Sequence, residues 1–233
     1  MGSPKVLKTQ TQEAGAPVVV DKLKPLAEIH LLVGGPYTAG GEEHVYGHTA
    51  IRVKVAGTDR VYDFGRYGRV VGDLGAEGEG ILRVWSSFAD YIAGENGLKR
   101  KTTGFVYAVF DAQAHSVNTY FASLIKAAKP RTDLARGRSS LTVYQLASNY
   151  HALGYNCTTL SLDGIRAALP TFENGSSSFI KPGDVLSFGE QVAMKTIGGG
   201  TPSRLFLPAN LEQFLKNKPA VKPMRVDVHG GRK

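Results

Sequence analysis

The chain has few of the features that fix a fold by means other than a hydrophobic core. Its 233 residues include one cysteine, Cys157. A single cysteine excludes an intramolecular disulfide and a cysteine-rich zinc site. No window approaches the ~20 consecutive apolar residues of a membrane span, and the first residues lack the apolar core of a Sec signal peptide. We therefore expect no transmembrane segment and, if the protein leaves the cytoplasm in which it is made, an export route other than Sec.

Acidic residues are also scarce. The chain carries 20 Asp and Glu against 28 Lys and Arg, which gives a formal net charge of +8. Such a balance attracts anionic partners. Much of the excess lies in Lys99-Arg100-Lys101 and in residues 216–225, without an aromatic ladder or a Cys/His finger spacing. We therefore expect no specific nucleic-acid recognition. Potential ligands with metal spacing are also missing, so we expect no metal and no other cofactor.

The composition predicts one ordered domain with loose ends. Hydrophobic residues make up 42% of the chain and charged residues 21%, which is enough to build one sizeable core. Residues 1–24 are polar, with scattered Pro and Lys, and we interpret them as a leader or linker. Residues 25–215 form the predicted catalytic domain, and residues 216–233 a basic tail. We expect a monomer.

The hydrophobic pattern predicts an α+β fold. Alternating or wholly apolar runs indicate strands, and apolar residues at helical spacing indicate helices. The predicted strands are residues 26–33, 46–55, 61–64, 81–85, 103–110 and 182–188, and the predicted helices are residues 87–93, 117–128, 141–153, 158–169 and 209–215. This order favours an antiparallel sheet with helices packed against one side.

Cys157 lies where the local structure favours a reactive thiol. Gly154 ends the preceding pattern, Asn156 is a good helix N-cap, and Pro170 stops the helix that follows. Cys157 is therefore predicted in the first helical turn, where free N–H groups and the helix dipole favour a thiolate. A lone cysteine can also be a small buried hydrophobe, so a catalytic role requires a partner base.

His48 is the preferred base. Residues 46–55 alternate in polarity, and His48 falls on the more polar face of the predicted strand. A histidine that simply faces solvent would give the same pattern. The other histidines are weaker candidates, except that His44 stays an alternative: His30 is in an apolar strand, His115 in a turn, His151 in a predicted helix and His229 in the basic tail.

Asp63 is the candidate to orient the imidazole. It lies in the return strand of a predicted hairpin, on the same face as His48 if the hairpin is regular. With a turn over residues 56–59, Asp63 would stand opposite Arg52, roughly 13 Å along the strand from His48. A bulge or a longer turn would bring it closer. Otherwise Asp63 pairs with Arg52, and a backbone carbonyl or Tyr46 orients the imidazole.

Three short motifs occur in a recognisable order: Tyr46-Gly-His-Thr-Ala-Ile-Arg-Val53, Val61-Tyr-Asp-Phe-Gly65 and Tyr155-Asn-Cys-Thr-Thr159. Together they resemble the circularly permuted branch of the NlpC/P60 papain-like superfamily, which also contains the lecithin:retinol acyltransferase-like enzymes. In that branch the histidine strand precedes the cysteine helix. The resemblance extends from Ile29 to Phe188.

The resemblance implies a permuted papain-like fold and a thiol hydrolase or acyltransferase. Cys157 would be the nucleophile, His48 the base and Asp63 the orienting residue, with the backbone N–H of Cys157 in the oxyanion hole. Tyr46 and Asn156 are further candidates for oxyanion or substrate contacts.

Bacterial members of this superfamily mostly look like cell-wall amidases or endopeptidases. The basic, disulfide-free chain without a Sec signal is similar in outline to antibacterial effectors of type VI secretion. The expected substrate is therefore the stem peptide of peptidoglycan in the periplasm of a target cell, and the expected partners are a secretion-apparatus component and a cognate immunity protein.

Two alternatives stay open. The first is a papain-like enzyme acting on protein conjugates or lipids, although no convincing amphipathic membrane-binding segment is present. The second is a binding domain without catalysis.

Overall fold

A computed structural model of the chain describes residues 27–39, 42–44, 46–71, 77–196 and 202–231. The polar leader expected over residues 1–24 lies outside these ranges. Within the part of the chain that the structure describes, no helix has the length and apolar character needed to cross a membrane.

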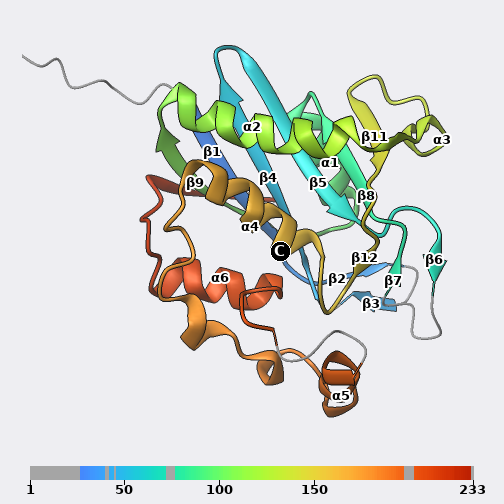
Figure 1. Cartoon of the computed structure of the whole chain (residues 1–233), viewed down its shortest axis with the longest axis vertical. Coiled ribbons are helices and arrows are strands. Elements are labelled where there is room, and N and C mark those ends of the chain that lie inside the picture. The colour runs from blue at the N-terminus through green and yellow to red at the C-terminus, as the bar shows by residue number, and fades with distance from the viewer. Residues whose placement is uncertain (1–26, 40–41, 45, 72–76, 197–201, 232–233) are drawn as a thin grey trace, which may run out of the picture.

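The described residues have a mixed α+β architecture built around a sheet of eight strands (Figure 1). Neighbouring strands of this sheet pair antiparallel. Their order is β10 (Lys129–Pro130), β11 (Leu141–Gln145), β8 (Ile81–Trp85), β5 (Thr58–Gly65), β4 (His48–Val55), β1 (Ala27–Gly34), β9 (Thr102–Val109) and β13 (Arg225–His229). The predicted α+β class and antiparallel sheet are confirmed.

Within the described ranges, two smaller sheets accompany the main one. One joins β12 (Tyr150–His151), β7 (Glu77–Gly78) and β6 (Val70–Val71), and the other joins β2 (Tyr37–Ala39) and β3 (Glu42–His44). Because Tyr150 pairs with Gly78, the first small sheet holds the segment that leads into the cysteine helix.

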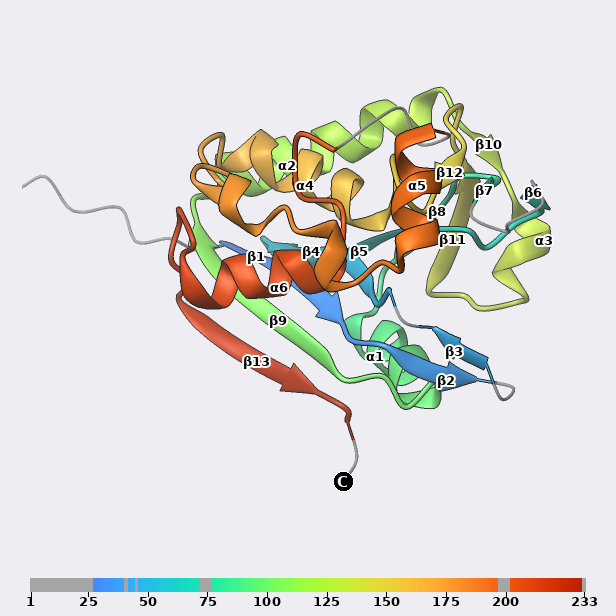
Figure 2. The ribbon, with the colours of Figure 1, turned by 90° about the horizontal axis from the view of Figure 1, so that it is seen from below.

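Helices cover both faces of the main sheet, whereas the sequence predicts them on one side. On one face lie α2 (Asp111–Lys126), α4 (Cys157–Ala168) and α6 (Pro208–Asn217), and on the other lies α1 (Phe88–Gly97) (Figure 2). Helices α2 and α4 bury apolar side chains against the strands, with Val117, Phe121 and Ile165 among them. Such spacing on α2 is that of an amphipathic helix.

The remaining helical elements of the described residues are short. They are α3 (Thr132–Ala135), α5 (Phe188–Thr196) and two 3₁₀ turns, Ser176–Phe179 and Pro182–Asp184. The prediction of a strand over residues 182–188 is wrong. Pro182 lacks the N–H that a strand interior would use, and it starts a 3₁₀ turn instead.

The predicted helix over residues 141–153 is also wrong. Leu141 and Val143 are buried and Thr142 between them is exposed, which is the two-residue period of strand β11. After a short connection the chain forms β12 and only then turns into α4. Tyr150 lies in this segment, in strand β12.

The segment expected to be a basic tail, residues 216–233, contributes to the main sheet. Strand β13 pairs with β9 along its length. Arg225 anchors it through an ion pair with Glu28 on β1, at 2.7 Å. The boundary predicted at residue 215 therefore lies inside the folded unit.

Candidate active site

Cys157 is the first residue of α4. The side chain of Asn156 caps this helix by accepting hydrogen bonds from the backbone N–H groups of Thr158 and Thr159, at 2.9 and 3.1 Å. Thr159 returns the contact, because its hydroxyl oxygen accepts from the N–H of Asn156 at 2.8 Å. This capping box fixes the direction in which the helix starts. The thiol therefore has a defined position.

Asn156 is fully engaged in this structural task. Its side-chain nitrogen donates to the carbonyls of Ala152 and Phe206, at 2.8 and 2.9 Å. Its oxygen is taken by the helix start, so both ends of the amide are satisfied. The expected oxyanion or substrate contact of Asn156 does not fit this arrangement, and its part is to hold Cys157 in place.

The cysteine helix is tied to the histidine strand. The hydroxyl oxygens of Thr49 on β4 and Thr158 on α4 are 3.0 Å apart, and both side chains are buried. His48 is the first residue of β4, so this contact brings the end of that strand to the start of α4. His48 is near enough to the thiol of Cys157 to lower its pKa.

Asp63 contacts His48 directly. Nε2 of His48 and Oδ1 of Asp63 are 2.6 Å apart, and both side chains are buried. Asp63 is opposite Ala50, on the same face of the hairpin as His48 and two residues along from it. Diagonal neighbours at this separation are within reach of side-chain hydrogen bonds.

The sequence-based register, with Asp63 opposite Arg52, is wrong. The β4–β5 turn contains only Ala56 and Gly57, with φ angles of 47° and 74°, and Val55 pairs with Thr58. Two left-handed residues are the requirement of a tight two-residue hairpin turn. This turn moves Asp63 two positions toward His48, and Arg52 pairs with Asp59 instead, at 2.6 Å.

Asp63 has two further partners that the sequence did not reveal. Nε of Arg83 on β8 donates to Oδ2 at 2.7 Å, and Nη2 of the same residue also reaches Oδ2. The hydroxyl of Tyr67 donates to Oδ1 at 2.9 Å and lies 3.3 Å from Nε2 of His48. The guanidinium of Arg83 stacks over the Tyr67 ring at 3.5 Å. The carboxylate is thus held from both oxygens.

The three groups change one another's pKa. Burial raises the pKa of Asp63, but the charges of Arg83 and His48 outweigh it and hold that pKa well below its usual range. Burial lowers the pKa of His48, but the charges of Asp63 and Cys157 raise it to about 10. Burial raises the pKa of Cys157, whereas the charge and hydrogen bond of His48 bring it below its usual value. These directions favour a thiolate beside an imidazolium.

Tyr150 is the residue that sequence reasoning missed on the cysteine side. Its hydroxyl lies 3.9 Å from Sγ of Cys157, within the range of a hydrogen bond to sulfur. The incorrect helix over residues 141–153 concealed it. In the sequence, the sign of this contact is that Tyr150 lies seven residues before Cys157.

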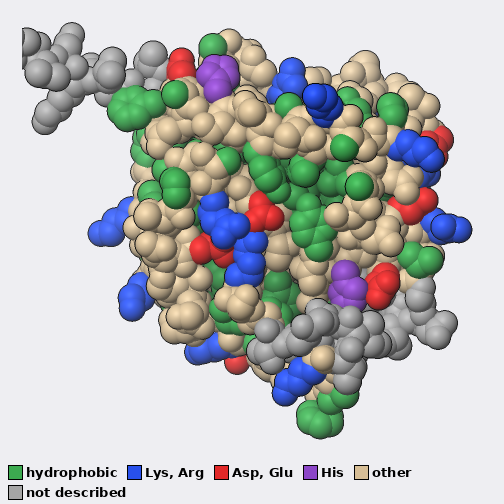
Figure 3. Space-filling model, viewed as in Figure 1, with side chains coloured by type: hydrophobic (Ala, Val, Ile, Leu, Met, Phe, Trp, Pro, Cys, Tyr) green, Lys and Arg blue, Asp and Glu red, His purple; other side chains and the backbone are tan. Residues whose placement is uncertain are grey.

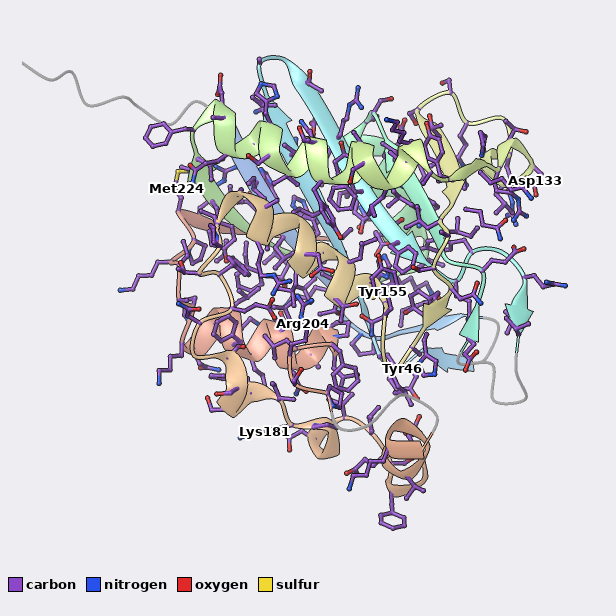
Figure 4. All side chains as sticks on the ribbon, viewed as in Figure 1. Tyr46, Asp133, Tyr155, Lys181, Arg204 and Met224 are labelled. Atoms are coloured by element: carbon purple, nitrogen blue, oxygen red, sulfur yellow. The ribbon has the colours of Figure 1, made fainter. Side chains whose placement is uncertain are left out.

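Asp63 and Tyr67 contact the imidazole of His48, whereas Tyr46 lies against an apolar cluster. Its half-buried ring packs with Leu153, Phe206 and Leu207. Figure 4 shows Tyr155 near the start of α4, Tyr46 below it in this view, and Arg204 between α4 and α6. Arg204 pairs with Asp163 and Glu173, at 2.6 and 2.7 Å. These ion pairs connect the segment before α6 to the cysteine helix. Figure 3 shows basic and acidic side chains gathered on this face of the molecule.

The other histidines lie elsewhere. His30 is buried and bonded to Glu28 at 2.9 Å, and His151 lies 3.4 Å from Glu77. His115 is in α2 and His229 in β13. His44 is in β3, and its side chain lies outside the described residues. Among the side chains that are described, no group of three or more His, Cys, Asp and Glu could hold a metal ion.

No family model, curated protein or solved structure matches this chain in comparisons with known proteins.

Proposed function

We propose that this protein is a cysteine hydrolase of the permuted papain-like type. The observation that supports it is one connected set of groups: a thiol at a helix N-terminus, an imidazole that lowers its pKa, and a buried carboxylate 2.6 Å from that imidazole. A nucleophile, a base and an orienting group are the parts of acyl-transfer catalysis. Their order along the chain is histidine, aspartate, cysteine, as in the family that the motifs resemble.

In this proposal each side chain has a defined task. Thiolate Sγ of Cys157 attacks the acyl carbon and forms a C–S bond, while the carbonyl oxygen becomes an oxyanion. The backbone N–H of Cys157 and the hydroxyl of Tyr150 are the donors available to that oxyanion. Protonated His48 gives its proton to the leaving amine as the C–N bond breaks, which leaves a thioester.

The second half of the reaction reverses the proton path. Neutral His48 takes a proton from water, and the water oxygen attacks the thioester carbon. Cleavage of the C–S bond then releases the carboxylic acid and restores the thiolate and the imidazolium. Asp63 stays ionised throughout and keeps Nε2 of His48 directed away from the sulfur, so that the other ring nitrogen serves the thiol.

The proposed substrate is the stem peptide of peptidoglycan, and the proposed biological role is that of an antibacterial effector of type VI secretion. A feature beside the site favours an anionic substrate. The aliphatic part of the Arg66 side chain lies over Gly78, because a Cβ added to Gly78 would be only 2.6 Å from Cγ of Arg66. Gly78 in turn pairs with Tyr150. Arg66 is exposed and has no ion-pair partner among the described residues. A carboxylate of the substrate would find this cation next to the oxyanion donor.

The test is digestion of purified peptidoglycan sacculi under reducing conditions, with the released muropeptides identified by mass spectrometry. The wild-type protein should release products with a newly cut amide bond, and Cys157→Ala should release none. Ser161→Ala, a buried change one turn further along α4, is the matched control and should remain active.

The outcomes separate the parts of the proposal. The wild type could leave sacculi intact and yet cleave lipids or ubiquitin-like conjugates in a Cys157-dependent way. That result would contradict the proposed substrate and support the proposed thiol chemistry. Identical behaviour of the wild type and Cys157→Ala on all three substrate classes would contradict the hydrolase itself.

A further inference from the structure

The carboxylate of Asp63 is shared by three donors. His48 and Tyr67 meet at Oδ1, at 2.6 and 2.9 Å, and Arg83 occupies Oδ2 with two nitrogens. Asp63 is completely buried, and a fifth of the Arg83 side chain is exposed. A carboxylate that only oriented an imidazole would not need a permanent cation on its second oxygen.

We propose that Arg83 and Tyr67 are positioning residues that tune how tightly His48 holds its proton, by dividing the charge of Asp63. This inference rests on the Cys157–His48 pair of the proposed function and assigns what adjusts that pair. Arg83 acts with a full charge, and Tyr67 with a hydroxyl dipole. Neither residue needs to touch the substrate.

The physical reason is the strength of charge interactions in a buried site. A lone carboxylate 2.6 Å from the imidazole would stabilise the imidazolium strongly, because little water screens the pair. An imidazolium that binds its proton too tightly is a poor acid toward a leaving amine. Arg83 offsets part of the carboxylate charge and makes the proton easier to release.

Charge counting gives the same result. Asp63 and Arg83 cancel, so transfer of one proton between Cys157 and His48 converts a neutral pair into an ion pair without changing the net charge of the site. Without Arg83 the site would carry one extra negative charge in either state. Both the thiol and the imidazolium would then lose their protons only at higher pH.

The groups around Arg83 do not replace it. Helix α1 presents Tyr91 and Glu95, and the carboxylate of Glu95 is already paired with Arg100 at 2.7 Å. The ring of Trp85 lies 5.4 Å from the guanidinium. Of the two arginines, Arg83 and Arg100, Arg83 is the one paired with the carboxylate of Asp63.

The test is the pH dependence of iodoacetamide labelling at Cys157, which is the only thiol in the chain. The labelling rate should rise in two steps, first when the ion pair forms and again when His48 loses its proton. In Arg83→Met both steps should move to higher pH, the second by about one unit. Tyr67→Phe, which keeps the ring under Arg83, should move the second step in the same direction by less. Arg83→Lys restores the charge and should reverse part of the shift.

Each result decides something different. A wild-type thiol that titrates like an ordinary cysteine would overturn both the proposed function and this inference. Two steps in the wild type that stay unchanged in both Arg83→Met and Tyr67→Phe, or that move to lower pH, would overturn the inference alone. Because Tyr67→Phe removes a single oxygen, it provides the answer if Arg83→Met does not fold.

Discussion

The two faces of the main sheet are built from different chemistry. The face under α2 and α4 is packed with aliphatic and aromatic side chains. The face under α1 buries the ionisable side chains His30, His48, Asp63, Glu95 and Arg100 among a smaller apolar cluster. The proposed nucleophile, Cys157, comes from a helix on the apolar face, and the proposed base and orienting acid, His48 and Asp63, come from the charged face. They meet at the end of β4, where the sheet no longer separates the two layers.

The candidate site draws on both faces of the sheet. A thiol packed only among apolar groups would keep its proton, because burial disfavours the thiolate. The charges that reverse this effect at Cys157 reach it from the other side of the sheet through His48. The apolar side chains therefore hold α4 in place. The charged side chains on the other face lower the pKa of Cys157 through His48.

The largest expected effect on activity is that of Asp63→Asn, a change on the charged face of the sheet. The amide cannot stabilise the imidazolium, so the resting pair should shift toward thiol and neutral imidazole. We expect kcat to fall by about 10²- to 10⁴-fold. Asp59→Asn, on the same strand but paired with Arg52, is the control and should leave kcat unchanged. Equal losses in the two variants would show that the effect comes from the strand and not from the site.

The next largest effect is expected from the buried Glu95–Arg100 pair. Glu95→Gln leaves the charge of Arg100 buried without its partner, so the free energy of unfolding should fall by about 3–5 kcal/mol. The double variant Glu95→Leu with Arg100→Met removes both charges and should lose much less. Urea unfolding measures all three proteins.

A matched change on the apolar face sharpens this prediction. Ile165→Ala should lower the free energy of unfolding by about 2–5 kcal/mol, because it creates a cavity in the core. It should not change the pH at which Cys157 is labelled, because it removes no charge. A shift in that pH would mean that the apolar layer also sets the chemistry of the thiol.

The pH dependence of activity should show the coupling between the layers. The folded pKa of His48 is raised from 6.5 to about 10, so the imidazolium survives through neutral pH. Activity should therefore fall as pH rises through about 10. The stability contributed by charged His48 should be fully present below about 6.5 and should disappear over the same rise. Thermal unfolding of the wild type and His48→Gln between neutral and alkaline pH measures it, and parallel curves for the two proteins would refute the coupling.

Much of the candidate site could be predicted because its parts are local. The alternation over residues 46–55 located the strand and the face of His48, and the N-cap at Asn156 located Cys157 at a helix start. The hairpin register could not be predicted, because it depends on Ala56 adopting a left-handed conformation that alanine rarely takes.

The partners of Asp63 lay beyond a sequence argument for a different reason. Arg83 comes from β8 and contacts Asp63 only because β8 pairs with β5. An arginine in the middle of the apolar run Ile81–Trp85 was the available sign of a buried charge, but the sequence did not say which acid it meets. Tyr150 was hidden by a segment whose apolar residues fit a helix and a strand equally well.

The smallest predicted effect is that of the helix cap. Asn156→Ala removes the acceptor for two N–H groups at the start of α4 and should lower the free energy of unfolding by about 0.5–2 kcal/mol. It should also slow iodoacetamide labelling at neutral pH, because a frayed first turn weakens the field that favours the thiolate. Asn156→Ser keeps one side-chain acceptor and should recover part of both losses. A loss of stability without any change in labelling would mean that His48 alone activates the thiol, and the charged face would then account for all of the chemistry.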